Sequence, residues 1–127
     1  MDHKPKAKTG ISRIWAAFFY SLNGLRFAIR NESAFRQESF IVGVLLVILL
    51  FLPLSFLWKL LLFFASIVVL IVELLNSAIE SVVDMASSEY HILAKRAKDL
   101  GSAAVLVSIV LLIVLWCGAI FWILKGR

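Results

Sequence analysis

The sequence predicts an all-α membrane protein with an N-terminal amphipathic surface helix and three transmembrane helices. Its 127 residues are 62% hydrophobic, well above the roughly 45–50% of an ordinary soluble domain. The mean hydropathy is +0.99, and the apolar residues gather in three long runs. One small soluble domain has no interior that could hold so many apolar side chains. Lipid is therefore the expected solvent for much of the chain.

The N-terminal third contains a basic tail and a predicted surface helix. Residues 1–10 are polar and basic, and we expect them to be disordered. Residues 11–30 place apolar side chains at steps of three and four, with arginines mostly off this stripe. That pattern is typical of a helix lying in the membrane interface. The apolar positions are Ile11, Ile14, Trp15, Phe18, Leu22, Leu25 and Ile29.

Three predicted spans occupy the remainder of the chain. The first covers residues 33–52, and Pro53 marks the turn that follows it. The second covers residues 54–84 and continues as a helix into the cytoplasm. A polar cytoplasmic loop is predicted over residues 85–98, and the third span over residues 99–124. Each apolar run is long enough to cross a bilayer once flanking helical residues are included.

The distribution of positive charge predicts the orientation. Ten of the thirteen Lys and Arg residues lie before Phe40 or in the loop between the second and third spans. Positive residues favour the cytoplasmic side, so the N-terminus and this loop are expected in the cytoplasm and the C-terminus in the periplasm. The net charge of +5 is spread by topology rather than clustered, which argues against nucleic acid as a partner. Cys117 is the only cysteine, so an intrachain disulfide is excluded.

Three carboxylates follow the second apolar run in the segment "VELLNSAIESVVD". Glu73 and Glu80 are seven residues apart and return to nearly the same helical azimuth, and Asp84 continues that face. Ionisable residues at membrane depth usually face a partner or a functional site. Asp84 also fits a solvated end of the helix. Glu73 does not, because apolar residues bracket it, and its desolvation makes it a candidate general base.

Further polar residues are predicted at the same cytoplasmic level. Glu32 and Glu38 stand at the entrance to the first span, and Lys98 and Asp99 open the third. Carboxylates from separate helices beside basic residues suit Mg²⁺ bound to a polyphosphate. The chain has neither a P-loop nor a glycine-rich kinase loop. These residues alone leave a kinase, a phosphatase and a cation transporter open.

Four motifs together resemble the small membrane-embedded diacylglycerol kinases of bacteria. They are "NESAFRQE" from Asn31, "VELLNSAIESVVD" from Val72, "SEYHILAKRAKDLGSAAVL" from Ser88 and the late "WC". The resemblance runs from about Thr9 to Trp122, with the motifs in the family's order. It implies a homotrimer in the bacterial inner membrane that uses MgATP to phosphorylate diacylglycerol in phospholipid biosynthesis.

The resemblance also implies roles for individual residues. Glu73 matches the family's catalytic base, and Asn76 matches the residue beside that base. Lys98 is expected at the transferred phosphoryl group. Glu32 and Glu80 match the metal-binding glutamates. Glu32, Glu80 and Lys98 are also predicted to bind the nucleotide. The other predicted nucleotide residues are Arg13, Tyr20, Glu89, Tyr90, His91 and Asp99. The predicted lipid-side residues are Arg26, Ala34, Phe35, Arg36, Glu38, Glu73, Ser102, Trp116 and Cys117.

Three other interpretations of the sequence remain. An undecaprenol kinase of the same superfamily would share the fold, the base and the metal residues, but that branch tends to have a histidine where Glu38 stands. A small proton-coupled transporter would use Glu73 as a relay. Transporters tend to hold such carboxylates near the bilayer midplane, whereas these gather at one interface. A structural subunit without chemistry would leave the acidic residues unexplained.

Overall fold

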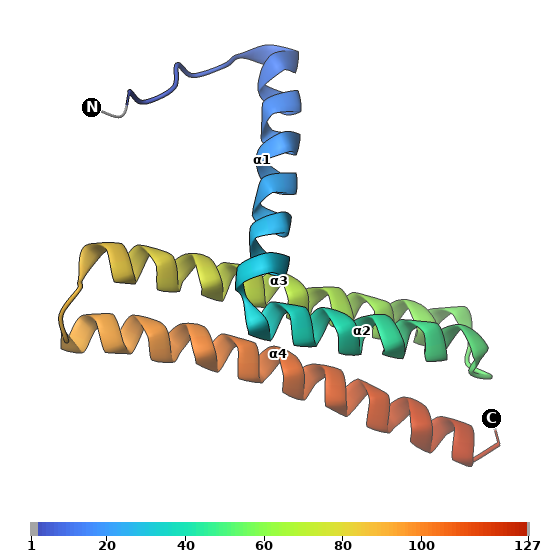
Figure 1. Cartoon of the computed structure of the whole chain (residues 1–127). Helices are drawn as coiled ribbons and strands as arrows, with labels where there is room; N and C mark the ends of the chain where they lie inside the picture. The colour runs from blue at the N-terminus through green and yellow to red at the C-terminus, as the bar shows by residue number, and fades with distance from the viewer. Residues whose placement is uncertain (1–2, 127) are drawn as a thin grey trace.

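Four helices form the protein in a computed structural model that describes residues 3–126. Helices α2, α3 and α4 lie side by side as a bundle, and α1 points away from it, transverse to the other three (Figure 1). The bounds are α1 Gly10–Asn31, α2 Ser33–Phe51, α3 Phe56–Ala86 and α4 Ile92–Leu124. By length and composition, α2, α3 and α4 could each cross a membrane. The predicted fold class is confirmed. The first two residues of the predicted tail lie outside the described residues, as does Arg127.

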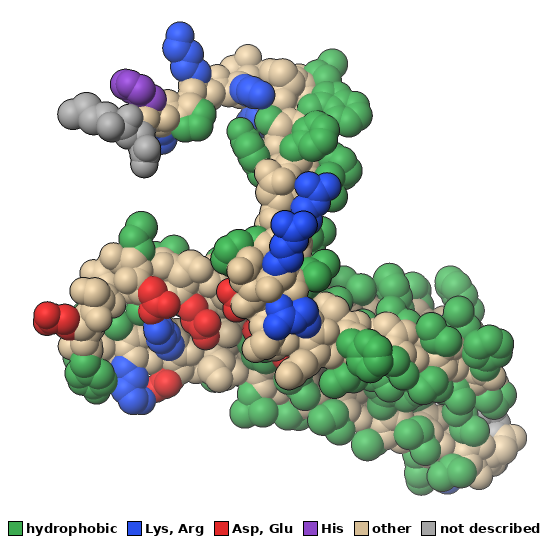
Figure 2. All heavy atoms as spheres, in the orientation of Figure 1, with side chains coloured by type: hydrophobic (Ala, Val, Ile, Leu, Met, Phe, Trp, Pro, Cys, Tyr) green, Lys and Arg blue, Asp and Glu red, His purple; other side chains and the backbone are tan. Residues whose placement is uncertain are grey.

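Helix α1 is amphipathic, as predicted. Its large apolar side chains are largely uncovered in this chain, with Ile11 74% and Ile14 70% exposed. Basic side chains follow a different face of the same helix (Figure 2). This arrangement suits a helix that rests in the membrane interface, with apolar groups toward the acyl chains and cations toward headgroups.

Helices α1 and α2 meet at a corner formed by one residue, Glu32. Its backbone is extended, at φ −104° and ψ 102°, and it ends α1 and begins α2. From the first turn of α2, Nη1 of Arg36 donates to the carbonyls of Ile29 at 3.0 Å and Arg30 at 2.8 Å. These carbonyls belong to the last turn of α1 and have no helical donor of their own. The guanidinium therefore holds the corner, and with it Glu32, in place.

Helix α4 begins earlier than the sequence suggested. It starts at Ile92 and not at Asp99, so the predicted loop over 85–98 contracts to residues 87–91. Nδ1 of His91 caps the helix by accepting from the Leu93 amide at 3.1 Å. An ion pair of 2.6 Å between Lys95 and Asp99 spans the first turns. A local cap and an i,i+4 pair thus extend the helix into a segment that is too polar for the bilayer core.

The bundle packs mainly between α3 and α4, with α2 lying against α3. Two small clusters of buried side chains form its core, one of Leu49, Leu62 and Ala119 and the other of Ala65, Val69 and Leu112. Most other large apolar side chains face outward, over the half of the bundle nearer the α2–α3 turn and the C-terminus (Figure 2). A surface of this kind is suited to lipid or to other subunits.

The core predicts a large difference between two leucines of α3. Leu62 is fully buried and Leu57 is 64% exposed. Leu62→Ala should destabilise the protein by about 2–5 kcal/mol, because it leaves a cavity between helices. Leu57→Ala, the matched control, should lower the free energy of unfolding much less. Unfolding of both variants in detergent micelles would measure this, and equal losses would contradict the described core.

Candidate active site

Glu73 lies about midway along α3, at the point where apolar residues give way to polar ones. Its side chain is only 5% exposed. Burial removes its water, and it feels the charges of Glu80 and Glu32. Glu38 of α2 lies beside it, with Oε2 buried and without a hydrogen-bond partner among the described residues. The structure therefore brings together four predicted carboxylates, contributed by α2, α3 and the α1–α2 corner.

Asn76 and Glu80 continue the same face of α3. The Asn76 side chain is 8% exposed, and its Nδ2 donates to Oε1 of Glu80 at 3.4 Å. Oδ1 of Asn76 is buried and has no hydrogen-bond partner among residues 3–126. The amide thus lies between Glu73 and Glu80 along the helix and orients Glu80. Asn76 follows the predicted base, Glu73, by three residues along α3, and the polar contact of its amide is with Glu80.

The α3–α4 connection contains a cavity of about 450 Å³. Five of the predicted nucleotide residues line it, namely Glu89, Tyr90, His91, Lys98 and Asp99. Nζ of Lys98 pairs with Oδ1 of Asp84 at 2.6 Å, and both side chains are largely exposed, at 44% and 66%. Because water screens this pair, Lys98 can exchange Asp84 for a phosphate oxygen at little cost. The cavity offers two lysines, Lys95 and Lys98, to a polyphosphate, and its lining also includes the carboxylates of Asp84, Glu89 and Asp99.

The other four predicted nucleotide residues do not line this cavity within one chain. Glu32 and Glu80 belong to the group of carboxylates around Glu73. Arg13 and Tyr20 lie on α1, which points away from the bundle (Figure 1), and both are exposed. No hydrogen bond or ion pair in the described part of the chain links them to α3 or α4.

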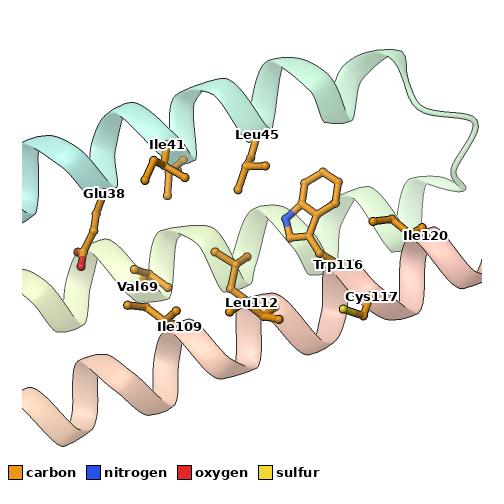
Figure 3. A pocket seen from close by; sticks show the side chains of 11 residues that line it. Glu38, Ile41, Leu45, Val69, Ile109, Leu112, Trp116, Cys117 and Ile120 are labelled. Carbon is orange, nitrogen blue, oxygen red and sulfur yellow. The ribbon is translucent and has the colours of Figure 1, made fainter.

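A second cavity, of about 400 Å³, runs between α2, α3 and α4 on the apolar side of the carboxylates. Glu38, Trp116 and Cys117, all predicted on the lipid side, line it, and Glu38 stands at one end (Figure 3). Every other lining residue is aliphatic. Val69, one helical turn before Glu73, also contributes. The cavity therefore leads from an apolar interior to the carboxylates.

The other lipid-side predictions are scattered. Phe35 is buried at 4% exposure, while Arg26, Ala34, Arg36 and Ser102 are exposed and line no part of this cavity. Arg36 holds the α1–α2 corner instead.

Sequence reasoning missed the aliphatic walls of this cavity. On α2 these are Ile41, Val42 and Leu45, which follow Glu38 at three, four and seven residues. That spacing marks one helix face, so the signal was present. An apolar face in a membrane protein usually meets lipid or another helix, however, and nothing in the residue types alone distinguishes a cavity wall.

The carboxylates fit a divalent cation that arrives with phosphate. No group of three or more His, Cys, Asp or Glu side chains within residues 3–126 closes around a metal position. Mg²⁺ needs only one or two carboxylates when phosphate oxygens and water complete its shell. Glu32 and Glu80 supply hard oxygen donors, and both act electrostatically on the buried Glu73. A cation would offset the repulsion among these like charges, so the donor set suits Mg²⁺.

Comparison with known proteins identifies the family. Residues 19–120 match the family model described as prokaryotic diacylglycerol kinase. The diacylglycerol kinase of Escherichia coli K12 is 50% identical over 109 residues, covering 86% of this chain and 89% of that protein. Diacylglycerol kinases of Pseudomonas aeruginosa and Haemophilus influenzae are 45% and 39% identical, over 87% and 90% of this chain and 90% and 97% of theirs. This chain therefore belongs to the prokaryotic diacylglycerol kinase family.

Proposed function

We propose that this protein transfers the γ-phosphoryl group of ATP to the free hydroxyl of 1,2-diacylglycerol, giving phosphatidic acid. The observation that carries the proposal is the position of Glu73. Along α3 this buried carboxylate lies between Val69, which lines the apolar cavity of about 400 Å³, and Asp84, which lines the polar cavity of about 450 Å³. A lipid alcohol has the same division, because its acyl chains are apolar and its reacting oxygen is polar. Family membership supports a lipid kinase over a transporter.

The lipid approaches from the bilayer with its acyl chains along the apolar cavity and its hydroxyl at the carboxylates. Glu73 accepts the hydroxyl proton as the oxygen attacks the γ-phosphorus of ATP. The bond from that phosphorus to the β,γ-bridging oxygen breaks, and ADP leaves. Lys98, released from Asp84, stabilises the negative charge of the transferred group. Glu32 and Glu80 would hold Mg²⁺, which neutralises phosphate charge when bound.

The nucleotide lies in the cavity at the α3–α4 connection, against Tyr90, His91 and Asp99. Arg13 and Tyr20 belong to α1, which points away from the bundle (Figure 1), and they do not line this cavity in the same chain. We therefore propose a homotrimer, in which other subunits cover the outward-facing apolar surfaces of the bundle and complete the nucleotide site. The bacterial inner membrane is its proposed location, with the active site on the cytoplasmic face.

Replacing the base tests the mechanism. Glu73→Gln keeps the shape of the side chain but cannot take a proton, so turnover should fall by about 10²–10⁴-fold. Glu89→Gln, the matched control, changes a nucleotide residue and should mainly raise KM for ATP. Phosphate transfer in mixed micelles would be measured with dioleoylglycerol, and unfolding would show that both variants fold. A fully active Glu73→Gln protein would end the assignment.

The same assay with undecaprenol tests the lipid. Glu38 favours diacylglycerol, because the undecaprenol kinases tend to have a histidine at this position. Wild-type protein should form phosphatidic acid and leave undecaprenol unchanged. Phosphate appearing on undecaprenol alone would keep the fold, base and metal residues but move the protein to the other branch of the superfamily.

Removing a metal ligand should change the need for Mg²⁺. Glu80→Gln should raise the Mg²⁺ concentration for half-maximal activity by about tenfold, and excess Mg²⁺ should restore part of the turnover. Glu89→Gln should leave the Mg²⁺ requirement unchanged at saturating ATP. Titrations of Mg²⁺ at fixed ATP would decide this. An unchanged Mg²⁺ curve for Glu80→Gln would remove Glu80 from the metal site.

The orientation is testable with single cysteines placed in a Cys117→Ala background. Ser88→Cys in the α3–α4 connection should react with a membrane-impermeant maleimide only after the inner membrane is broken. Lys125→Cys, next to the end of α4, should react in intact spheroplasts. The reverse pattern would invert the proposed topology.

A further inference from the structure

Gly101 of α4 lies against Asn76, on the active-site face of α3. It is buried, and a methyl group added at its α-carbon would fall within the contact distance of Oδ1 of Asn76 and 3.3 Å from Cγ. No other glycine in the described residues would place a methyl group so close to a polar side chain. The absence of a side chain at position 101 is therefore what leaves room for the Asn76 amide.

The Asn76 amide is confined from two sides. Nδ2 donates to Oε1 of Glu80 at 3.4 Å, while Oδ1 points at Gly101 and has no conventional donor among the described residues. The α-hydrogen of Gly101 lies in the direction that a Cβ would take, so it faces Oδ1. Contacts of this Cα–H···O kind recur where helices approach closely. Rotating the amide away from Gly101 would carry Nδ2 off Glu80.

We propose that Gly101 is a positioning residue for metal binding, acting through Asn76 on Glu80. The inference rests on the proposed function only in assigning Glu80 to the metal. With no Cβ at position 101, the amide stays in the gap between α3 and α4 and holds the Glu80 carboxylate toward Glu73. A methyl group there forces either the amide or α4 to move. Because α3 and α4 pack against each other along the bundle, rotation of one side chain is the smaller change.

Two other glycines provide matched controls. Gly118 is also in α4, where an added methyl group would lie 3.3 Å from Cη2 of Trp58, so Gly118→Ala disturbs the same pair of helices far from the carboxylates. An added methyl group at Gly43 of α2 meets nothing within 4 Å. Gly43→Ala therefore reports only the effect of replacing a helical glycine, and its Mg²⁺ requirement should match that of the wild type.

The first experiment measures metal binding with and without turnover. Gly101→Ala should raise the Mg²⁺ concentration for half-maximal activity by about tenfold, as loss of a group that orients a ligand usually does, with KM for dioleoylglycerol unchanged. The same shift should appear in the Mg²⁺ concentration needed for a nonhydrolysable ATP analogue to raise the unfolding temperature. Wild-type values for Gly101→Ala, or an equal shift in Gly118→Ala, would overturn the proposal.

The second experiment is a double-mutant cycle on stability, without Mg²⁺ or nucleotide. Asn76→Ala removes Oδ1 and Cγ and leaves Cβ at 3.9 Å from the added methyl group, an ordinary contact. Gly101→Ala should destabilise the wild type but cost little in the Asn76→Ala background. Additive losses would show that Gly101 does not act through Asn76 and would overturn the proposal.

The two proposals fail in different ways. A wild-type protein that binds Mg²⁺ and the ATP analogue but forms no phosphatidic acid would refute the proposed function. The role of Gly101 would then be tested by the binding and stability measurements alone. A wild-type protein whose stability with the analogue does not respond to Mg²⁺ would refute the inference, since Glu80 would then hold no metal.

Discussion

The arrangement of this protein depends on a buried carboxylate, that of Glu73, placed where the apolar part of α3 ends. A charge without water is costly unless neighbouring groups compensate it. Here the neighbours are further carboxylates and an amide, from α3 itself, from α2 and from the α1–α2 corner. This cluster of carboxylates has an excess of negative charge that a cation or a proton must offset. In a phosphoryl-transfer site, the cation would arrive bound to the phosphates of the nucleotide.

Local side-chain hydrogen bonds position the polar groups on the same side of the bundle as Glu73. Arg36 holds the corner that places Glu32, and His91 caps α4 so that Lys98 and Asp99 are presented on a helix rather than on a loop. The ion pairs of Lys98 with Asp84 and Lys95 with Asp99 are exposed, so they keep the charges soluble without fixing them. The buried part of the site is thus the helix face that carries Glu73 and Asn76. The exposed ion pairs lie where we propose that the nucleotide binds, and they can exchange partners.

The apolar half of the bundle has a different task. Its core within one chain is small and is built from Leu62, Ala65 and a few partners, while most large side chains face outward. In lipid there is no hydrophobic penalty for this exposure. The same openness leaves a cavity beside Glu38 that is lined by aliphatic groups (Figure 3), and the N-terminal part of α1 projects away from the bundle (Figure 1). Both features suit an enzyme whose substrate arrives sideways from the bilayer.

The sequence by itself determined the fold class and the polar face of α3, because hydropathy and helical periodicity depend on nearby residues alone. It also identified Glu73 as unusual, since a carboxylate within "LIVELL" has no local reason to be there. It did not predict that α4 begins at Ile92, where a cap and an ion pair outweigh the polarity of the segment. Only the tertiary structure decided that Glu38 lies beside Glu73, that Arg36 closes a corner, and that Gly101 faces Asn76. Those contacts join residues from different helices or across a helix break, and their formation depends on the angles and register of helix packing, which residue types do not encode one position at a time.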